Sequence, residues 1–266
     1  MTIKPPVVER AIACRFPRIE PEAFLSAKKR WQSEMVGGGF EESVVKHWEI
    51  KIPAESTGGP DLAKATMALR EEFQYKKDGN TILRPCQDLF SVNLIGADNT
   101  SFDQAAQLAE KYIPKWLEIA HILQPIEVEL IYVDEFNGAH FSPFILDNGE
   151  LNLHGIFKLP IFSPFSGGVF VVPLSQKYAW KRREAPNVLF SVAIDISSPR
   201  PNHYFARLFQ TAAQTLGQND HDLKKSIKSI LRDLHNMHLE SFQGMLTSAM
   251  LKHCDIEVTP VSEASL

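Results

Sequence analysis

Cysteine is scarce in this sequence, and the few thiols it has are scattered. The 266 residues include three cysteines, Cys14, Cys86 and Cys254, which are far apart and form no Cys-x-x-Cys pair. An odd, dispersed set of this kind excludes a disulfide framework and a zinc site built from thiolates. We therefore expect the three cysteines to be small buried hydrophobic residues.

The short motifs of several common enzyme classes are also missing. The sequence has no G-x-x-x-x-G-K-[ST] or G-x-G-x-x-G nucleotide motif, no G-x-S-x-G serine-hydrolase motif and no H-E-x-x-H zinc motif. The glycine run at 37–39 is interpreted as a helix terminator. We predict no cofactor and no bound metal, and the sequence leans towards a protein that is not an enzyme.

Basic excess and long apolar runs are likewise lacking. The formal net charge is −4, whereas proteins that hold duplex nucleic acid usually carry a basic surplus. The short group Lys181-Arg182-Arg183 keeps nucleic-acid contact open as a lesser alternative. No apolar run approaches the ~20 residues that span a bilayer, and the N-terminus lacks the apolar region of a signal peptide. We expect a cytoplasmic protein without membrane contact.

The content that remains is ordinary for a globular chain, with 44% hydrophobic and 23% charged residues. Alternating apolar residues predict strands at 7–16, 44–52, 66–75, 80–95, 126–136, 168–174 and 187–196. Helical spacing predicts a helix that opens at Pro21, a second over 101–123 and a long C-terminal helix from about 220 to 250. Runs of adjacent strands favour antiparallel pairing, so the predicted fold class is α+β.

The order of these elements suggests an internal duplication. We predict two similar halves, each a curved antiparallel sheet that grips a helix. The N-terminal half would span residues 1–125 and the C-terminal half residues 126–258, with a tail at 259–266. Residues 138–168 would form a flap within the second half.

Two histidines, His235 and His238, lie three residues apart in the last predicted helix. This spacing presents two ring nitrogens on neighbouring helix faces, as in metal sites of helix bundles. However, His238 falls within the apolar stripe, which favours a buried histidine that holds a hydrogen bond. We therefore prefer a structural role for His238.

The flap at 138–168 is rich in apolar residues and repeats the string Phe-Ser-Pro-Phe at 141–144 and 162–165. A connection of this length is usually functional or disordered, and its composition is not that of a disordered segment. One interpretation makes Phe141, Phe144, Phe162 and Phe165 an aromatic surface for a partner, a second subunit or an apolar ligand. The other, which we favour, packs the flap over the sheet.

Several strings resemble a family of sporadically distributed, uncharacterised prokaryotic proteins of similar length. PPVVERAIACRF and DLFSVNLIG resemble its "PP-V-V-E" and "L-L-S-V-N" strands, residues 187–196 its "L-x-x-D-I-D" strand, and LRDLHNMHLESFQGMLT its terminal helix. Residues 126–136 stand where the family has an "R-Y-I-N" strand, but lack its arginine and asparagine. The residues carried over are Glu9, Ser91, Asn93, Tyr132, Asp195, His235 and Phe242. The resemblance implies an accessory or mobile bacterial locus, including defence or toxin–antitoxin settings.

Together these observations lead to two hypotheses about function. The first is a non-enzymatic binding or assembly protein of an accessory bacterial locus, which acts through a protein partner or by self-association to a homo-oligomer. Its contact surface would be the flap, with a contribution from the long terminal helix. The alternative is a small-molecule or metal-binding enzyme whose pocket is lined by Glu9, Asn93, Asp195 and His235.

Overall fold

The computed structural model describes residues 7–51, 66–96, 101–149, 151–158, 174–200, 203–217 and 223–254. The strands are β1 (Val7–Arg15), β2 (Glu41–Lys51), β3 (Thr66–Lys77), β4 (Thr81–Pro85), β5 (Leu89–Ile95), β6 (Glu127–Phe136), β7 (Leu174–Lys181), β8 (Val188–Arg200) and β9 (His203–Thr215). The helices are α1 (Pro21–Gly37), α2 (Phe102–Ile119), α3 (Gly138–Phe141), the 3₁₀ turn η3 (Ser142–Phe144), α4 (Leu153–Ile156), α5 (Leu223–Met245) and α6 (Ser248–His253).

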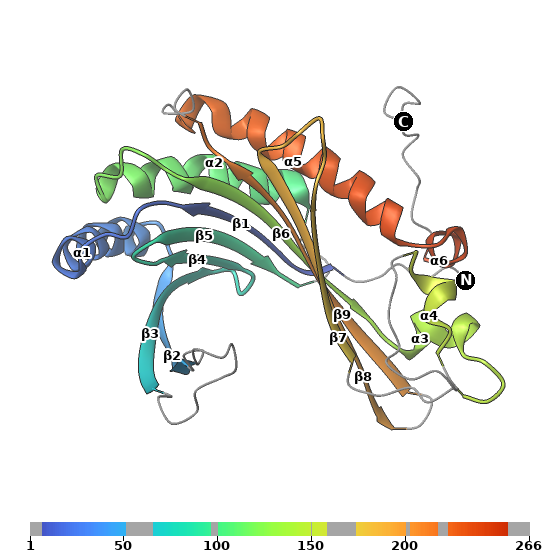
Figure 1. Cartoon of the computed structure of the whole chain (residues 1–266). Coiled ribbons are helices and arrows are strands. Elements are labelled where there is room, and N and C mark those ends of the chain that lie inside the picture. Colours follow the sequence, from blue (N-terminus) through green and yellow to red (C-terminus); the bar gives the residue numbers. More distant parts are fainter. Residues whose placement is uncertain are drawn as a thin grey trace.

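All nine strands belong to one antiparallel sheet in the order β2-β3-β4-β5-β1-β6-β9-β8-β7 (Figure 1). The first and sixth strands are neighbours at its centre, where Ala11 lies opposite Ile131. The helices lie on one side of this sheet, and the predicted α+β fold class is confirmed.

A hydrophobic core fills the space between the sheet and the helices α1, α2 and α5. Ile12 of β1, Val92 of β5 and Leu130 of β6 face this core and are fully buried. Trp31 of α1 packs edge-on against Phe90, with ring centroids 5.2 Å apart, and against Trp116 of α2, at 5.5 Å. Aromatic rings from two helices and a central strand thus fix how α1 and α2 lie on the sheet.

Local sequence signals account for the ends of these helices. Pro21 opens α1, where its missing N–H costs nothing. Ser101 caps α2 by accepting a hydrogen bond from the backbone N–H of Gln104, 3.1 Å away. The second helix ends at Ile119, earlier than the predicted residue 123, because the chain turns at His121, whose φ is +55°.

A second hydrophobic cluster lies on the same side of the sheet, beneath α3, α4 and α6. Its members include Phe141, which is fully buried, and Phe144, which is 8% exposed. These rings pack with Val192 and Ile194 of β8, so they cannot form an exposed partner surface. For these two residues the aromatic-surface interpretation is wrong, because the described part of the flap packs onto the sheet. Phe162 and Phe165 lie outside the described residues.

The strand predictions need two corrections, and one predicted strand lies almost wholly outside the described residues. The predicted strand at 80–95 is two strands, β4 and β5, separated by a turn in which the Cys86 N–H donates to the Leu89 carbonyl. The strand predicted at 168–174 lies outside the described residues except for Leu174, where β7 begins. Strand β9 was not predicted at all. Between β3 and β4 the chain turns at Asp78 and Gly79, whose φ angles are positive (+53° and +73°), as an Asp-Gly pair between two strands favours.

The last predicted helix is also divided. Helix α5 ends at Met245, and Thr247 caps α6 by accepting a hydrogen bond from the Met250 N–H. A capping threonine favours the start of a new helix over the continuation of the old one. Among the described helices, none combines the length and apolar character needed to cross a membrane.

Strands β2 and β3 extend beyond the rest of the sheet as a two-stranded ribbon. All eleven residues of β2 pair with β3, but β3 pairs with β4 only from Tyr75 to Lys77. The ribbon projects below the sheet in Figure 1. Met67 (63% exposed) and Leu69 (48% exposed) place apolar side chains on it, and such a ribbon is only marginally stable by itself.

Candidate functional site

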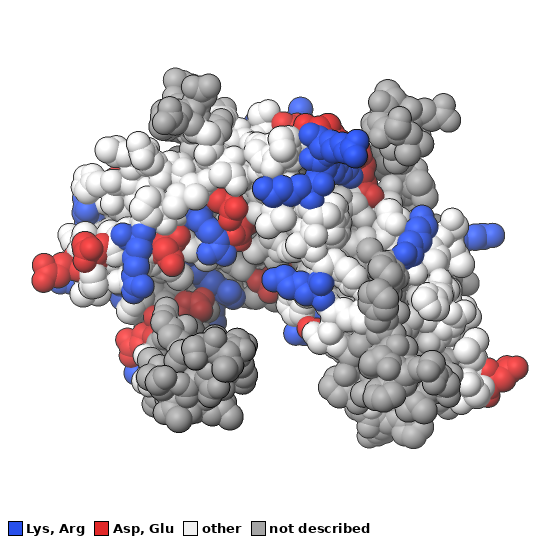
Figure 2. All heavy atoms as spheres, viewed as in Figure 1, with Lys and Arg blue, Asp and Glu red and all other residues white. Residues whose placement is uncertain are grey.

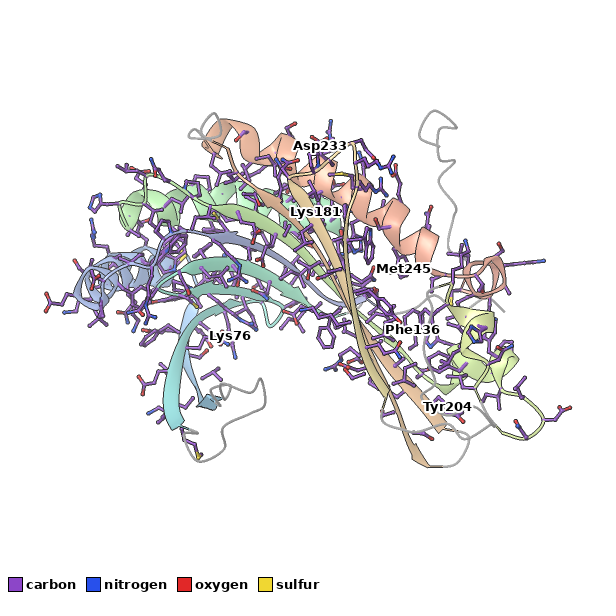
Figure 3. All side chains as sticks on the ribbon, in the orientation of Figure 1. Lys76, Phe136, Lys181, Tyr204, Asp233 and Met245 are labelled. Carbon is purple, nitrogen blue, oxygen red and sulfur yellow. The ribbon has the colours of Figure 1, made fainter. Side chains whose placement is uncertain are left out.

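No described helix covers the other side of the sheet, and we call this side the open face. Strand alternation places Glu9, Ala11, Ala13 and Arg15 of β1 there, because Ile12 and Cys14 point into the core. In Figure 2 the molecule is hollowed beneath the middle of the sheet. Lys76 of β3 and Asp233 of α5 lie on opposite sides of the sheet (Figure 3).

Small side chains form the floor of the open face along its middle strands. Ala11 (4% exposed) and Ala13 (1% exposed) lie beside Ser91 of β5, which is also buried. On the other half, Thr211 of β9 faces Ser191 of β8. Ala11, Ala13 and Ser91 are too deeply buried for a partner to reach, so contacts at the middle of this face would involve the larger side chains around them.

Three of the residues singled out from the sequence meet on this face. The Asn93 Nδ2 donates to Glu9 Oε1 at 2.7 Å, and the Ser91 Oγ donates to Asn93 Oδ1 at 2.8 Å. Asn93 is 3% exposed, so its amide is held by these two bonds. The three carried-over residues therefore form one hydrogen-bonded row.

The charges of the open face are largely neutralised within it. Arg15 of β1 forms an ion pair with Glu129 of β6, and its Nε lies 3.6 Å from Glu127. Burial, the hydrogen bond to Glu129 and the charge of Glu129 raise the pKa of Glu127. Strand alternation alone would leave both glutamates in solvent, but Glu129 is only 7% exposed.

The Arg15→Met variant tests this pairing. Removing the guanidinium leaves the Glu129 carboxylate buried and without its ion pair, and because Arg15 is half-exposed we expect a loss of roughly 2 kcal/mol in the free energy of unfolding. Urea titration of Arg15→Met, Glu129→Gln and the double variant measures the coupling. Additive losses in the double variant would show that the two side chains do not stabilise each other.

The far end of the open face carries a second polar group. Asp195 of β8 lies opposite Ser175 of β7 and Arg207 of β9. The Ser175 Oγ donates to Asp195 Oδ1 at 2.5 Å. Arg207 instead reaches towards the neighbouring strand β6, where its Nε donates to Glu135 Oε1 at 2.9 Å. A cavity of about 350 Å³ lies beside these residues, with Phe205 and Phe209 in its lining.

On the opposite side of the sheet, His235 belongs to a polar cluster beneath α5. The Tyr132 Oη and the His235 Nδ1 are 2.8 Å apart, and the ring of Phe102 stacks on His235 at 3.8 Å. His238 stacks on the Tyr132 ring at 4.1 Å, and the Arg10 guanidinium lies 5.1 Å from the same ring. Tyr132 thus joins β6 to both histidines of the last long helix.

This cluster is buried without full hydrogen bonding. Neither ring nitrogen of His238 has a hydrogen-bond partner in the described part of the chain, and the imidazole is 5% exposed. Burial lowers the pKa of His238 to about 3, helped by His235 and Arg10. Burial also lowers the pKa of His235 to about 4, with Arg10 adding to the effect. Both rings are therefore neutral at pH 7.

Asp134 is the acidic member of the same region. The Gln210 Nε2 donates to its Oδ2 at 2.6 Å, and the carboxyl group is 4% exposed. Burial raises the pKa of Asp134 to about 7, against the opposing effects of the Gln210 hydrogen bond and the Arg10 charge. The sequence placed Asp134 at a strand end and did not indicate its burial.

The pocket predicted from Glu9, Asn93, Asp195 and His235 does not form. Glu9 and Asn93 are in contact on the open face, and Asp195 is on the same face three strands away from Glu9. His235 lies on the helix-covered side with Tyr132. The correction follows from β1 itself: Arg10 faces the cluster of His235, so its neighbour Glu9 must face the other way.

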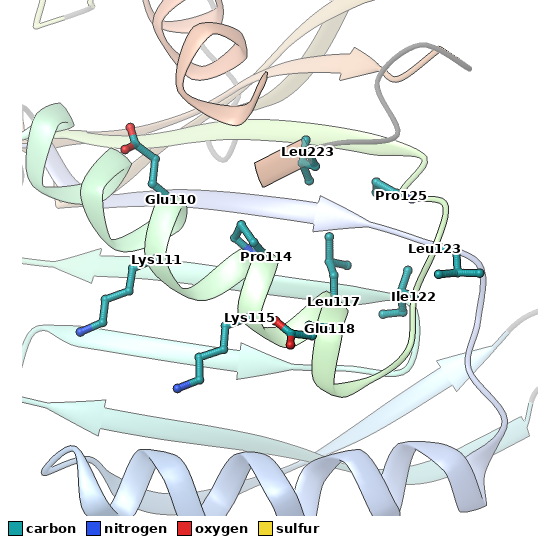
Figure 4. A pocket seen from close by; sticks show the side chains of 10 residues that line it. All are labelled: Glu110, Lys111, Pro114, Lys115, Leu117, Glu118, Ile122, Leu123, Pro125 and Leu223. Carbon is teal, nitrogen blue, oxygen red and sulfur yellow. The ribbon is translucent and has the colours of Figure 1, made fainter. Parts of the chain in front are cut away.

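A further hollow of about 480 Å³ lies between α2 and the start of α5 (Figure 4). Leu117, Ile122 and Leu223 gather at one end, while Lys111 and Lys115 point away from them. Lys115 is paired with Glu34 of α1. Because its charged side chains point in different directions, they cannot act together on one bound molecule. Within the described residues, no group of three His, Cys, Asp or Glu side chains is arranged to hold a metal ion.

Compared with protein-family models and with curated proteins, the chain matches none of them. The resemblance to the sporadically distributed prokaryotic family therefore stays a prediction. Arg207, Phe205 and Phe209 were missed because β9 was not predicted. The run of aromatic and apolar residues over 204–209, which follows the turn residues Pro201 and Asn202, was the signal that could have found them.

Proposed function

We infer first that the chain consists of two similar halves, as the sequence suggested. In each half a strand (β1 or β6) is followed by a helical segment, a run of hairpin-linked strands and a long helix (α2 or α5). The last strand of each run, β5 or β9, returns to pair with the strand that opened its half. Since β1 and β6 are antiparallel neighbours, a two-fold relation between them would generate one half from the other.

We propose that the protein is a non-enzymatic binding or assembly protein that holds a protein partner against its open face. The observation that carries this proposal is the position of all described helices on one side, which leaves a hollowed, polar sheet face on the other. This site replaces the flap, whose described aromatic residues are buried. The setting in an accessory bacterial locus, such as defence or toxin–antitoxin systems, rests on the family resemblance alone.

The charge pattern of the open face favours a protein over a nucleic acid. Arg15, Arg84 and Arg207 each form an ion pair with a glutamate of the same face. Nucleic-acid surfaces instead offer cations that neutralise phosphates and release counterions. A face whose arginines are already neutralised suits a partner that brings hydrogen bonds, apolar side chains and single charges.

Self-association would place a second copy of the chain in the partner's role. The exposed Met67 and Leu69 lie on the face of β3 that Tyr75 shares, away from the open face, and together with the edge of β2 they offer a second copy an additional contact on the projecting ribbon. Light scattering coupled to gel filtration distinguishes a second copy of the chain from a different protein as the partner. A dimer that dissociates in a Met67→Lys variant supports a second copy.

The Ala193→Arg variant tests the open face directly. Ala193 of β8 lies opposite Phe209 on this face, and an arginine there would fill the hollow and leave a charge to be buried by the partner. We expect the proteins retained by the tagged full chain in its native host to fall at least about tenfold, as for loss of an interface centre. Quantitative mass spectrometry of the retained proteins measures the change.

The matched control is Ser229→Arg on the exposed side of α5, which should keep the same proteins. Circular dichroism and thermal melting establish that both variants fold. Equal retention by Ala193→Arg and wild type, equal loss in the two variants, or no retained protein at all would contradict the proposal.

The alternative, an enzyme, would have to use the cluster beneath α5, because the four predicted pocket residues are divided between two sides of the sheet. The Tyr132–His235 contact and the unpaired nitrogens of His238 are the observations in its favour. Native mass spectrometry of the purified chain, which reveals a tightly bound small molecule or metal, discriminates this alternative from the open-face proposal.

A further inference from the structure

The cavity at the far end of the open face has two aromatic walls and a short polar floor. Phe205, Arg207 and Phe209 follow one another on the same side of β9 and stand opposite Ser197, Asp195 and Ala193 of β8. Because the residues of β8 are short, a trough of about 350 Å³ is left beside the two phenyl rings. Its volume suits one long side chain.

The charges of this trough do not cancel. Arg207 is engaged by Glu135, through both its Nε and its Nη2. Asp195 stands directly opposite Arg207, yet no cation of the described chain lies within ion-pair distance of it, and Ser175 is its one described hydrogen-bond donor. The exposed carboxylate of Asp195 is therefore left without a positively charged partner, beside the rings of Phe205 and Phe209.

We propose that this trough binds a basic side chain, arginine above all, of the protein partner. The guanidinium would donate to Asp195, while its planar face and methylene stem would lie against Phe205, where cation–π attraction adds to apolar contact. The Phe209 ring, over which the Arg207 guanidinium already lies at 5.8 Å from the centroid, would add apolar contact at its edge. An acidic or phosphorylated side chain is disfavoured, because Arg207 is occupied and Asp195 repels it. This inference rests on the proposed function and names the chemistry of its partner.

The inference is tested with a small probe and the full chain. The ¹⁵N-labelled protein is titrated with Nα-acetyl-L-arginine amide, and with the uncharged isostere Nα-acetyl-L-citrulline amide. We expect saturable shifts of the backbone amides around Asp195 and Phe209, with the citrulline probe binding at least about tenfold more weakly, as for loss of a charge-assisted hydrogen bond. Equal binding of the two probes, or no saturable shift at high-millimolar arginine amide, would overturn the assignment.

Two variants distinguish binding in the trough from the effect of removing one negative charge anywhere on the protein. Asp195→Asn keeps the shape and can still accept the Ser175 hydrogen bond, so it should fold and weaken the arginine probe at least about tenfold. Asp233→Asn on the exposed face of α5 removes the same charge elsewhere and should leave binding unchanged. If both variants weaken binding equally, or if Nα-acetyl-L-glutamate amide binds more tightly than the arginine probe, the inference is wrong.

The failure of this inference can be told apart from failure of the proposed function. Loss of the partner in Ala193→Arg together with no arginine binding would leave the open face as a binding surface with another specificity. Binding of the arginine probe that Asp195→Asn weakens, without any partner lost in Ala193→Arg, would leave the trough as a site and contradict the wider surface.

Discussion

Replacing Asp134 by asparagine is expected to make the protein acid-sensitive: between pH 7 and pH 4.5 the variant should lose roughly 3 kcal/mol more free energy of unfolding than the wild type. Asp134 has an ordinary pKa of 3.8 and a pKa of about 7 in the fold. Between these values the folded state binds more protons than the unfolded state. Stability from this group therefore rises as the pH falls, and Asp134→Asn abolishes that gain.

The histidines act in the opposite sense. His238 has an ordinary pKa of 6.5, which burial lowers to about 3 in the fold. Below pH 6.5 the unfolded state therefore binds more protons, and the fold loses stability as the pH falls towards 3. His235, whose pKa is about 4 in the fold, adds to this loss, although solvent screens part of the effect because the ring is only half-buried. In the wild type the gain from Asp134 offsets much of the loss from His238.

Urea denaturation at a series of pH values measures these contributions. Asp134→Asn should steepen the decline of stability below pH 6.5, and His238→Phe should flatten it, because a phenyl ring fills a similar space without a proton to bind. Asp233→Asn, on the exposed side of α5, is the control and should follow the wild type. Parallel curves for Asp134→Asn and the wild type would contradict the buried, protonated state of Asp134.

The Trp31→Ala variant is expected to lose roughly 3–5 kcal/mol of the free energy of unfolding, as for a large aromatic residue deleted from a closed core. Trp31 is fully buried and touches rings from α2 and β5, so the cavity cannot collapse without moving a helix. A loss of this size is a large part of the stability of a typical domain. Equilibrium unfolding in guanidinium, followed by far-ultraviolet circular dichroism, measures it.

Two matched variants sharpen the result. Trp31→Phe keeps most of the ring packing and removes an indole N–H that has no hydrogen-bond partner in the described chain, so it should cost far less. Leu25→Ala lies on the same helix, but Leu25 is 51% exposed and its loss should fall below about 1 kcal/mol. Similar losses for Trp31→Ala and Leu25→Ala would contradict the packing of α1 on the sheet.

Much of the fold was predictable because its signals are local. Ser101 before an apolar helical stripe, Pro21 at a helix start and the Asp78-Gly79 turn each act within a few residues. Strand β6 was predicted from its alternation. Strand β9 was not, because large apolar residues such as Phe205 and Phe209 stand on its open face and obscure the alternation.

The site was less predictable, because it depends on which face of a strand each residue occupies. Glu9 and Asn93 are brought together by the pairing of β1 with β5, which no short motif encodes. His235 was selected for its spacing from His238, yet its contacts come from Tyr132 on a distant strand. The burial of Asp134 follows from α5 lying over β6, a tertiary effect that sequence alternation does not contain.

The most direct test of the central proposal places a photo-reactive benzoylphenylalanine at Ser191, on the floor of the open face, or at Ser229, on the exposed side of α5, in the full chain in its native host. We expect one discrete crosslinked protein from Ser191, lost when Ala193→Arg is added, and none from Ser229. The same crosslinked protein from both positions, or from Ser229 alone, would contradict the open face as the binding surface.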